Sequence, residues 1–371
     1  MAPPPRQRHS YSIGKTNFSA FLSGLKTQSY HEPMISRTST PHRCVELNPL
    51  VDHSTVRALE KLISASSIRS IAWNPLGTLI ATGASDGTIR VWNPDKPKSI
   101  YSTELNTSPS KGHHRAGIEK IAFNPVKDAE LCSVSNDGVV KFWDVRSKAI
   151  INEVKGLGEA FTLAWAPDGE SLVVGNKLDN IFVLSPTNAS IISTHQQQVQ
   201  TNQITFCYSG KKIFLTTGEG RVKILSYPAF EPVFHLSYDP TTPFTLNGHT
   251  SSCLTVELQP SARYLATGGS DAIIALWDTT DWICQRTIAD MIGPVRSISF
   301  SFDGSYIVGG SDEGVGLEVI HTETGDQIHT IKTPGGQPCT IVSWHPNRYW
   351  LAYSDLGGLK ILGVDVSTER K

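Results

Sequence analysis

The sequence predicts an all-β protein, a ring of seven four-stranded antiparallel sheets of the β-propeller type. Three observations support this fold. The chain repeats a pattern of three short strands joined by a Pro-type turn and an Asp-Gly-type turn, seven segments fit the pattern, and they follow one another at steps of 41 to 52 residues. Repeats of about 40 to 45 residues that each supply three or four strands are typical of propeller blades.

Composition is consistent with one large globular domain. The 371 residues are 39% hydrophobic and 18% charged, which is ordinary for a soluble protein. The six cysteines are scattered without a zinc or disulfide spacing, so we expect buried thiols in a reducing compartment. No apolar run approaches the roughly 18 to 20 residues that span a bilayer, and we expect neither membrane insertion nor secretion.

The seven repeats can be bounded from their strands and turns. They cover residues 67–93, 117–144, 161–184, 204–225, 253–278, 295–320 and 339–363. In each, an apolar strand runs into a turn, a second strand follows, and a tight turn leads to a third strand. The third strand ends in Trp in the first, second and fifth repeats. Because seven segments fit the same pattern of strands and turns, the predicted fold does not depend on any single match.

Two Trp-Asp pairs, at 143–144 and 277–278, end the third strands of the second and fifth repeats. With the repeats around them, they make the chain similar to the WD-repeat family from about residue 54 to 366. The resemblance implies a seven-bladed propeller with a fourth, outer strand in each blade.

In WD repeats, a His before the blade, a Ser or Thr in the second strand, an Asp in the tight turn and the Trp form a buried hydrogen-bonded set. The fifth repeat supplies His249, Thr267, Asp271 and Trp277. The second supplies His113 or His114 with Ser133, Asp137 and Trp143, and the first supplies Thr82, Asp86 and Trp92 with no clear His. Each bond contributes about 1 kcal/mol net, and an unpaired buried partner would cost more. The other four repeats lack the Trp, so we expect them to rely on packing alone.

The stretch GASDG at 83–87 fits the G-x-S-x-G pattern of hydrolases with a serine nucleophile. That pattern has catalytic meaning only where a helix follows the serine. Here TIRVWN at 88–93 alternates like a strand, and Ser-Asp recurs in the same turn of other repeats. We therefore interpret Ser85 as a turn residue of a β-hairpin.

The last repeat lacks an outer strand, and a complete ring needs one. We expect residues 54–64, just upstream of the first repeat, to supply it. The predicted organisation is then a disordered basic Ser/Pro-rich tail over 1–50, a propeller over 51–366 and a short C-terminal tail over 367–371. Residues 94–112 and 236–248 are expected to be exposed loops.

Charge is distributed unevenly along the chain. Residues 1–43 have a net charge of +5, which leaves −6 for the rest. Such a tail is most simply disordered, and two other interpretations remain open. Its cations, among them Arg6, Arg8 and Lys15, could form a contact arm for RNA or an acidic protein, or the tail could be a mitochondrial transit peptide.

No motif in the sequence indicates catalysis. There is no zinc-protease, P-loop or dinucleotide-binding pattern, and the histidines form no ligand cluster. We expect no catalytic, cofactor or metal site and no small-molecule substrate. Trp282, which follows the third strand of the fifth repeat, is a candidate anchor for a protein partner if it is partly exposed.

Several passages resemble more than a generic propeller. LTTGEGRVKILSYPAFEPV (215–233), LATGGSDAIIALWDTTDWICQRTI (265–288) and SWHPNRYWLAY (343–353) are similar to the family of THO complex subunit 3. This implies a nuclear, non-enzymatic subunit that couples transcription elongation to mRNP assembly, mRNA processing and mRNA export. The partners implied are larger helical scaffold subunits of the THO complex and other mRNP export factors, with RNA contact indirect or through the tail. Two alternatives remain: an adaptor in another nuclear complex, such as a ubiquitin ligase or chromatin complex, or a propeller that binds RNA directly through its basic tail.

Overall fold

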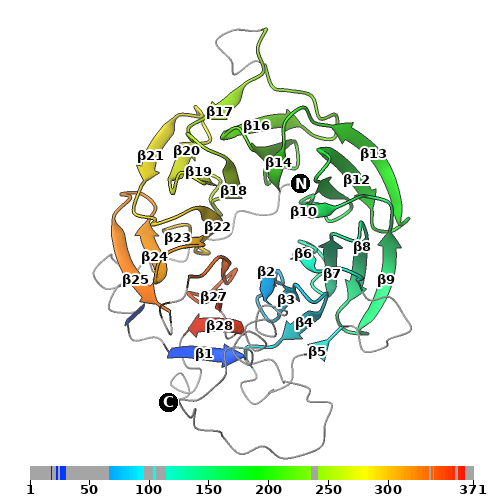
Figure 1. Ribbon diagram of the computed structural model, residues 1–371, viewed down its shortest axis with the longest axis horizontal. Coiled ribbons are helices and arrows are strands. Elements are labelled where there is room, and N and C mark those ends of the chain that lie inside the picture. Colours follow the sequence, from blue (N-terminus) through cyan, green and yellow to red (C-terminus); the bar gives the residue numbers. More distant parts are fainter. Residues whose placement is uncertain are drawn as a thin grey trace, which may run out of the picture.

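In the computed structural model, seven four-stranded sheets stand as blades around a central axis (Figure 1). The structure describes residues 18, 22–23, 26–30, 67–95, 103–105, 114–234, 241–333, 336, 338–355 and 358–363. In six blades the strands follow chain order from the axis to the rim, and the seventh blade takes its rim strand from the N-terminal part of the chain. The predicted all-β, seven-bladed propeller closed by an N-terminal strand is confirmed.

The first four blades follow one another along the chain. Blade 1 contains β2 (Ile68–Trp73), β3 (Ile80–Ala84), β4 (Ile89–Trp92) and β5 (Thr103–Glu104). Blade 2 contains β6 (Ile118–Phe123), β7 (Glu130–Ser135), β8 (Val140–Asp144) and β9 (Ala149–Val154). Blade 3 contains β10 (Ala160–Trp165), β11 (Leu172–Asn176), β12 (Asn180–Ser185) and β13 (Ser190–Gln196). Blade 4 contains β14 (Thr201–Phe206), β15 (Lys212–Thr217), β16 (Arg221–Ser226) and β17 (Thr245–Asn247).

The last three blades complete the ring. Blade 5 contains β18 (Cys253–Leu258), β19 (Tyr264–Gly269), β20 (Ile274–Asp278) and β21 (Cys284–Ile288). Blade 6 contains β22 (Val295–Phe300), β23 (Tyr306–Ser311), β24 (Gly316–His321) and β25 (Gln327–Lys332). Blade 7 contains β26 (Val342–Trp344), β27 (Leu351–Asp355), β28 (Gly358–Gly363) and β1 (Lys26–Tyr30).

The hydrophobic core lies between neighbouring blades. Seven clusters of buried apolar side chains fill the seven spaces, and one of them joins Ile274 and Leu276 of blade 5 to Val295 and Ile298 of blade 6. Second strands are therefore covered on both faces, and every residue of β19 and β23 is buried. This explains why these strands are apolar or small throughout and do not alternate.

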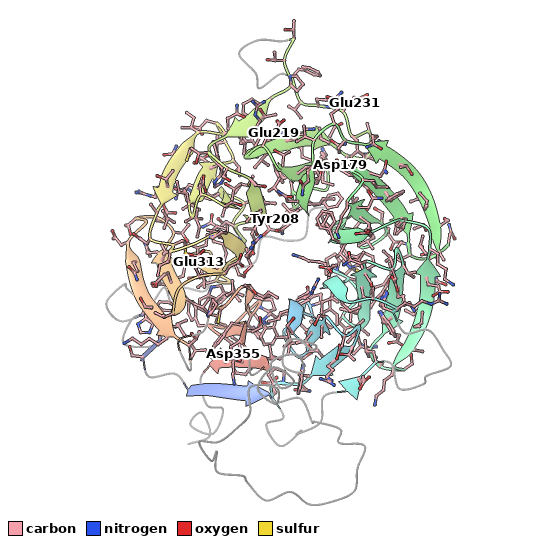
Figure 2. The ribbon with its side chains drawn as sticks, in the orientation of Figure 1. Asp179, Tyr208, Glu219, Glu231, Glu313 and Asp355 are labelled. Carbon is pink, nitrogen blue, oxygen red and sulfur yellow. The ribbon has the colours of Figure 1, made fainter. Side chains whose placement is uncertain are left out.

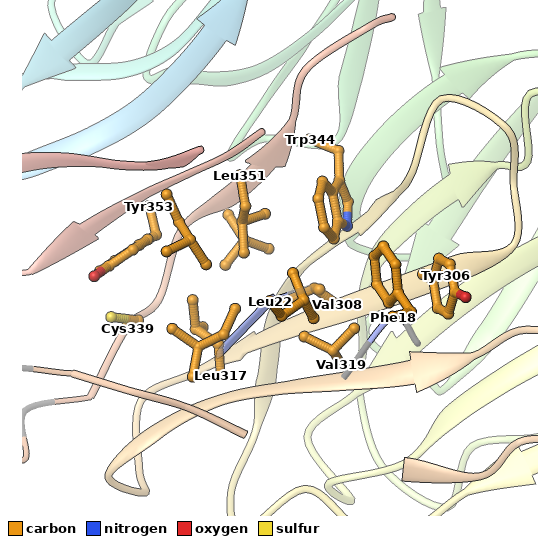
Figure 3. Close-up of a cluster of buried hydrophobic side chains, with 13 residues drawn as sticks. Phe18, Leu22, Tyr306, Val308, Leu317, Val319, Cys339, Trp344, Leu351 and Tyr353 are labelled. Atoms are coloured by element: carbon orange, nitrogen blue, oxygen red, sulfur yellow. The ribbon is translucent and has the colours of Figure 1, made fainter. Parts of the chain in front are cut away.

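The ring closes through a segment that sequence analysis placed in the tail. β1 pairs antiparallel with β28, with Lys26 opposite Gly363 and Tyr30 opposite Leu359. Just before it, Phe18 and Leu22 are fully buried between blades 6 and 7, among Tyr306, Leu317, Trp344 and Leu351 (Figure 3). Phe18, Leu22 and residues 26–30 thus belong to the propeller, and we call them the N-terminal latch.

The prediction that residues 54–64 fill the outer place of the last blade is therefore wrong, because β1 occupies it. Proximity favoured 54–64, since most connections between elements are short. The buried pair Phe18 and Leu22 instead anchors the more distant segment. Residues 54–64 themselves lie outside the described residues, as do most of the predicted tail and the C-terminal tail.

The two stretches expected to be exposed loops each contain a rim strand. β5 lies within 94–112 and β17 within 236–248, and both complete their blades. They are among the shortest described strands, two and three residues long, which is why no strand pattern was visible. In the part of the chain that the structure describes, no helix is long and apolar enough to cross a bilayer.

Candidate interaction faces and the central channel

The fifth blade brings together its four expected residues. His249 Nε2 lies 2.8 Å from Thr267 Oγ1, and its Nδ1 lies 3.1 Å from a carboxylate oxygen of Asp271. The Trp277 indole donates to the same Thr267 oxygen at 3.0 Å. Asp271 also accepts the Thr250 amide at 3.0 Å. The set ties the loop that enters the blade to two of its strands, β19 and β20, and to its tight turn.

Blade 2 holds an equivalent set, and the histidine in it is His114. His114 Nε2 and the Trp143 indole each lie 2.8 Å from Ser133 Oγ, and His114 Nδ1 lies 3.2 Å from Asp137 Oδ2. Burial opposes ionisation of Asp137, but hydrogen bonds from His114 and the Arg115 amide outweigh it and lower the pKa of Asp137 to about 2. Burial lowers the pKa of His114. The other candidate, His113, lies outside the described residues.

Blade 1 has a reduced set. The Trp92 indole donates to Thr82 Oγ1 at 3.3 Å, whereas Asp86 accepts hydrogen bonds from the amide and hydroxyl of Thr88 in its own turn. The Ser85 amide donates to the carbonyl of Ser67 at 2.9 Å. A strand, β4, begins a few residues after Ser85. Ser85 is thus a hairpin residue and lacks the helix that a nucleophile elbow needs.

The remaining blades use other polar groups, so the expectation that they rely on packing alone is wrong in at least blades 3 and 4. In blade 3, Asn176 Oδ1 accepts the amides of Leu178 and Asn180, and its Nδ2 donates to Leu157 O at 2.7 Å. In blade 4, Thr217 Oγ1 donates to Arg221 O at 3.0 Å. One side chain at the end of the second strand therefore fixes the tight turn where the Trp set is absent.

Sequence analysis missed a second series of links on the opposite face. The residue before the Pro-type turn of one blade donates to the turn glycine of the next. Asn124 Nδ2 lies 2.9 Å from Gly169 O, Gln259 Nε2 2.7 Å from Gly304 O, and His345 Nε2 2.8 Å from Gly77 O. The three turn glycines of blades 1, 3 and 6 have φ of 73°, 73° and 74°, a conformation that favours glycine.

The link from His345 to Gly77 joins blade 7 to blade 1. It is thus a second closure of the ring, on residues unrelated to the N-terminal latch. Burial lowers the pKa of His345 to about 4, so the imidazole is neutral at physiological pH. The sequence signal was the shared position before the turn, where Asn, Gln and His all carry a side-chain N–H.

A central channel of about 830 Å³ is lined by residues of six inner strands, β2, β6, β14, β18, β22 and β26. Its wall is held by side chains that accept amides of the next blade: Ser70 from Ile121, Ser297 from Val342, and Glu257 from Phe300, at 3.0 to 3.1 Å. These bonds join inner strands that have no backbone ladder between blades. The open centre of the ring is visible in Figure 2.

Two ionisable groups that line the channel have shifted pKa values. Lys120 and Glu257 both line it, and desolvation lowers the pKa of Lys120 while it raises the pKa of Glu257 to about 7. Sequence could not reveal them because channel-facing positions depend on the register of each blade. Among the described residues, no group of three His, Cys, Asp or Glu side chains could hold a metal ion.

Comparison with known proteins agrees with this architecture. The model of the WD domain, G-beta repeat, matches residues 50–93, 105–144, 240–278 and 282–315. THO complex subunit 3 of Arabidopsis thaliana is 31% identical over 310 residues, which cover 81% of this chain and 93% of that protein. The chain belongs to the THO complex subunit 3 family of WD-repeat proteins. WD repeat-containing protein AAC3 of Dictyostelium discoideum is 33% identical over 302 residues, covering 77% of this chain and 61% of that protein.

This WD-repeat family member offers two faces built from turns. The turns between second and third strands contribute Asp179, Glu219 and Glu313 (Figure 2). On the other face, the turns between first and second strands expose Leu76, Val126 and Tyr208. Single exposed apolar residues are ordinary, so neither face is a hydrophobic docking site by composition alone.

Of the four residues proposed to contact partners, the structure describes only Trp282. Trp282 is only 9% exposed and packs against Phe214, with ring centroids 5.6 Å apart, so the prediction of a partly exposed anchor is wrong. A positive φ of 61° turns the chain at Trp282 and directs its ring into the space between blades 4 and 5. Arg6, Arg8 and Lys15 lie outside the described residues.

Proposed function

We propose that the protein is a non-catalytic scaffold and adaptor subunit of a nuclear THO complex. The observation that carries the proposal is the match to THO complex subunit 3, which extends over 93% of that relative. A match limited to one or two blades would support the fold alone. The match instead extends over 81% of this chain, which supports a role shared with that relative.

The chemistry of the described residues is compatible with a binding role. Polar side chains of the hydrogen-bonded sets are occupied with one another, and His249 and His114 each bond to two side chains. They stabilise turns and leave the two faces of the ring as the surfaces for partners. In this role the protein would contact larger helical scaffold subunits and other mRNP export factors in the nucleus. It would thereby help to couple transcription elongation to mRNP assembly, mRNA processing and mRNA export.

Affinity purification of the tagged full chain from nuclear extract tests this proposal. We expect the scaffold subunits of the THO complex to be recovered. Recovery of a ubiquitin ligase or a chromatin complex in their place would establish the alternative adaptor role, and absence of the THO scaffold would refute our proposal.

Paired surface variants then locate the docking face. Glu219→Lys with Glu313→Lys changes the turns of one face, and Val126→Lys with Leu76→Lys changes the other. Since these side chains lie in turns and bond little of the fold, both variants should fold as the wild type does. The face whose variant loses the THO scaffold is the docking face, and the other variant is its matched control.

Direct RNA binding is a second candidate because charge is asymmetric, +5 over residues 1–43 and −6 over the rest. Phosphate contacts make affinity fall steeply with salt. A filter-binding series over salt concentration should therefore compare the full chain with a chain lacking residues 1–17. That deletion removes Arg6, Arg8 and Lys15 and spares the latch. Equal affinity of the two chains would exclude residues 1–17 from RNA binding.

A further inference from the structure

The rim of the ring consists of sheet edges. Among the described residues, each blade ends in an outermost strand with a neighbour on one side only, so its other side presents backbone N–H and C=O groups. Proteins protect such edges with short strands or with charged side chains, because an open edge is a template for another strand.

Six of the seven rim strands carry one of these protections. β5 and β17 are only two and three residues long. The other four contain at least one charged residue: Lys26 in β1, Glu153 in β9, Arg286 in β21 and Lys332 in β25. Charges on these strands would have to be desolvated if another strand paired with them.

β13 in blade 3 carries neither protection. It is seven residues long, its sequence is SIISTHQ, and it contains no Asp, Glu, Lys or Arg. The uncharged run extends from residue 180 to residue 210. Ile191 and Ile192 are 42% and 60% exposed, and β-branched residues favour the extended conformation. Among the described residues, β12 is the one strand that pairs with β13.

The apolar character continues onto the rim of blade 2. Asn152 in β9 donates to Pro186 O at 2.7 Å, which holds β9 against the turn before β13. The neighbouring Ile151 is 52% exposed. Ile151 and Ile192 both occupy the position where the ladder of their rim strand shifts register. Two adjacent blades thus present an exposed isoleucine at the same place.

We propose that β13 is the docking edge for β13 of a second copy of this chain, so that two blade-3 sheets join into one continuous eight-stranded sheet. Main-chain hydrogen bonds supply the affinity in this mode of association. Twofold pairing brings the same patch of both chains together.

The absence of charge in β13 favours a second copy of this chain as the partner strand. A charged partner strand would find no counter-ion in the uncharged run, whereas β13 meets no like charge when it pairs with itself. Antiparallel self-pairing of β13 brings only uncharged side chains opposite one another, so no pair of like charges destabilises it. His195 stacks on Phe230, with centroids 4.1 Å apart, and partial burial lowers its pKa. This shift favours the neutral imidazole.

Light scattering coupled to size exclusion tests the proposal on the full chain. We expect the wild-type mass to rise with protein concentration toward twice the 40.5 kDa monomer. Ile192→Lys should remain monomeric, because it places a charge in the unprotected edge. Ile283→Lys, at a residue that is 58% exposed in blade 5, is the matched control and should dimerise as the wild type does.

Hydrogen exchange gives an independent readout. Amides of β13 should gain protection as the protein concentration rises, and those of the charged rim strand β25 should not. A wild-type chain that stays monomeric throughout the series overturns the proposal. An Ile192→Lys chain that dimerises as strongly as the wild type also overturns it, since the interface would then lie elsewhere.

Discussion

Phe18 stacks face to face on Tyr306, with ring centroids 3.6 Å apart and planes 8° from parallel. Phe18 precedes the first blade by some fifty residues of sequence, and Tyr306 lies in β23 of blade 6. The contact therefore ties the beginning of the propeller to its end. With β1 and Leu22 it makes the N-terminal latch an integral part of the core between blades 6 and 7.

The first prediction concerns this latch. Phe18→Ala should lower the free energy of unfolding by about 3 to 5 kcal/mol, because it removes a fully buried aromatic ring and leaves a cavity. Urea denaturation followed by tryptophan fluorescence measures the change. Leu76→Ala, at a residue 56% exposed, is the control and should change stability little. Equal effects of the two substitutions would show that the latch does not contribute to the ring.

The second prediction separates two aspartates in equivalent turns. Asp271→Ala should destabilise the protein more than Asp86→Ala. Asp271 bonds to His249 and to the Thr250 amide, whereas Asp86 accepts hydrogen bonds from Thr88 within its own turn. Loss of Asp271 leaves a buried imidazole without its partner, at a cost of roughly 1 to 3 kcal/mol. Thermal unfolding of the two variants compares them directly, and an equal loss in both would argue against the four-residue set.

The third prediction is a pH effect at the junction of blades 7 and 1. Burial lowers the pKa of His345 to about 4 from an ordinary value of 6.5. The unfolded chain therefore gains a proton before the folded one as pH falls, and stability should drop between pH 6.5 and 4 by on the order of 3 kcal/mol. His345→Gln introduces the residue that blade 5 uses at the same position, and it should remove this part of the slope. A variant with the wild-type slope would contradict the assignment.

The fourth prediction has the opposite sign. Desolvation raises the pKa of Glu257 to about 7 from 4.5, so the folded protein retains a proton that the unfolded chain has lost. Stability should fall as pH rises from 4.5 to 7, again by on the order of 3 kcal/mol. Glu257→Gln keeps an oxygen for the Phe300 amide and should gain stability relative to the wild type at pH 8 but not at pH 4. The two-pH comparison cancels any packing cost of the substitution.

The repeats could be predicted because the strands and turns of each blade require particular residue types at regular positions. Second strands such as LATGG, at 265–269, are buried on both faces and must be apolar or small, and turns need Asp or Gly at fixed places. The Trp-containing sets follow from the same regularity. His249, Thr267, Asp271 and Trp277 keep a constant spacing relative to the strands of their blade, so their meeting is implied by the repeat.

Features that break the repeat could not be found in this way. β1 has the sequence KTQSY, which has no apolar alternation, and its place is defined by Phe18 and Leu22. Trp282 stands among polar residues, yet its positive φ turns it into the core. Lys120 of blade 2 and Glu257 of blade 5 interact electrostatically across the channel. Only the assembled ring brings these two blades to the same channel.

The pairing of β1 with β28 also sets an order of events during synthesis. β1 leaves the ribosome before every other described strand, and β28 leaves it after all of them. The N-terminal segment therefore stays unpaired, with Phe18 and Leu22 exposed to solvent, until blades 6 and 7 have been synthesised. Until its late partner arrives, those two side chains are exposed to chaperones and to aggregation in every nascent copy.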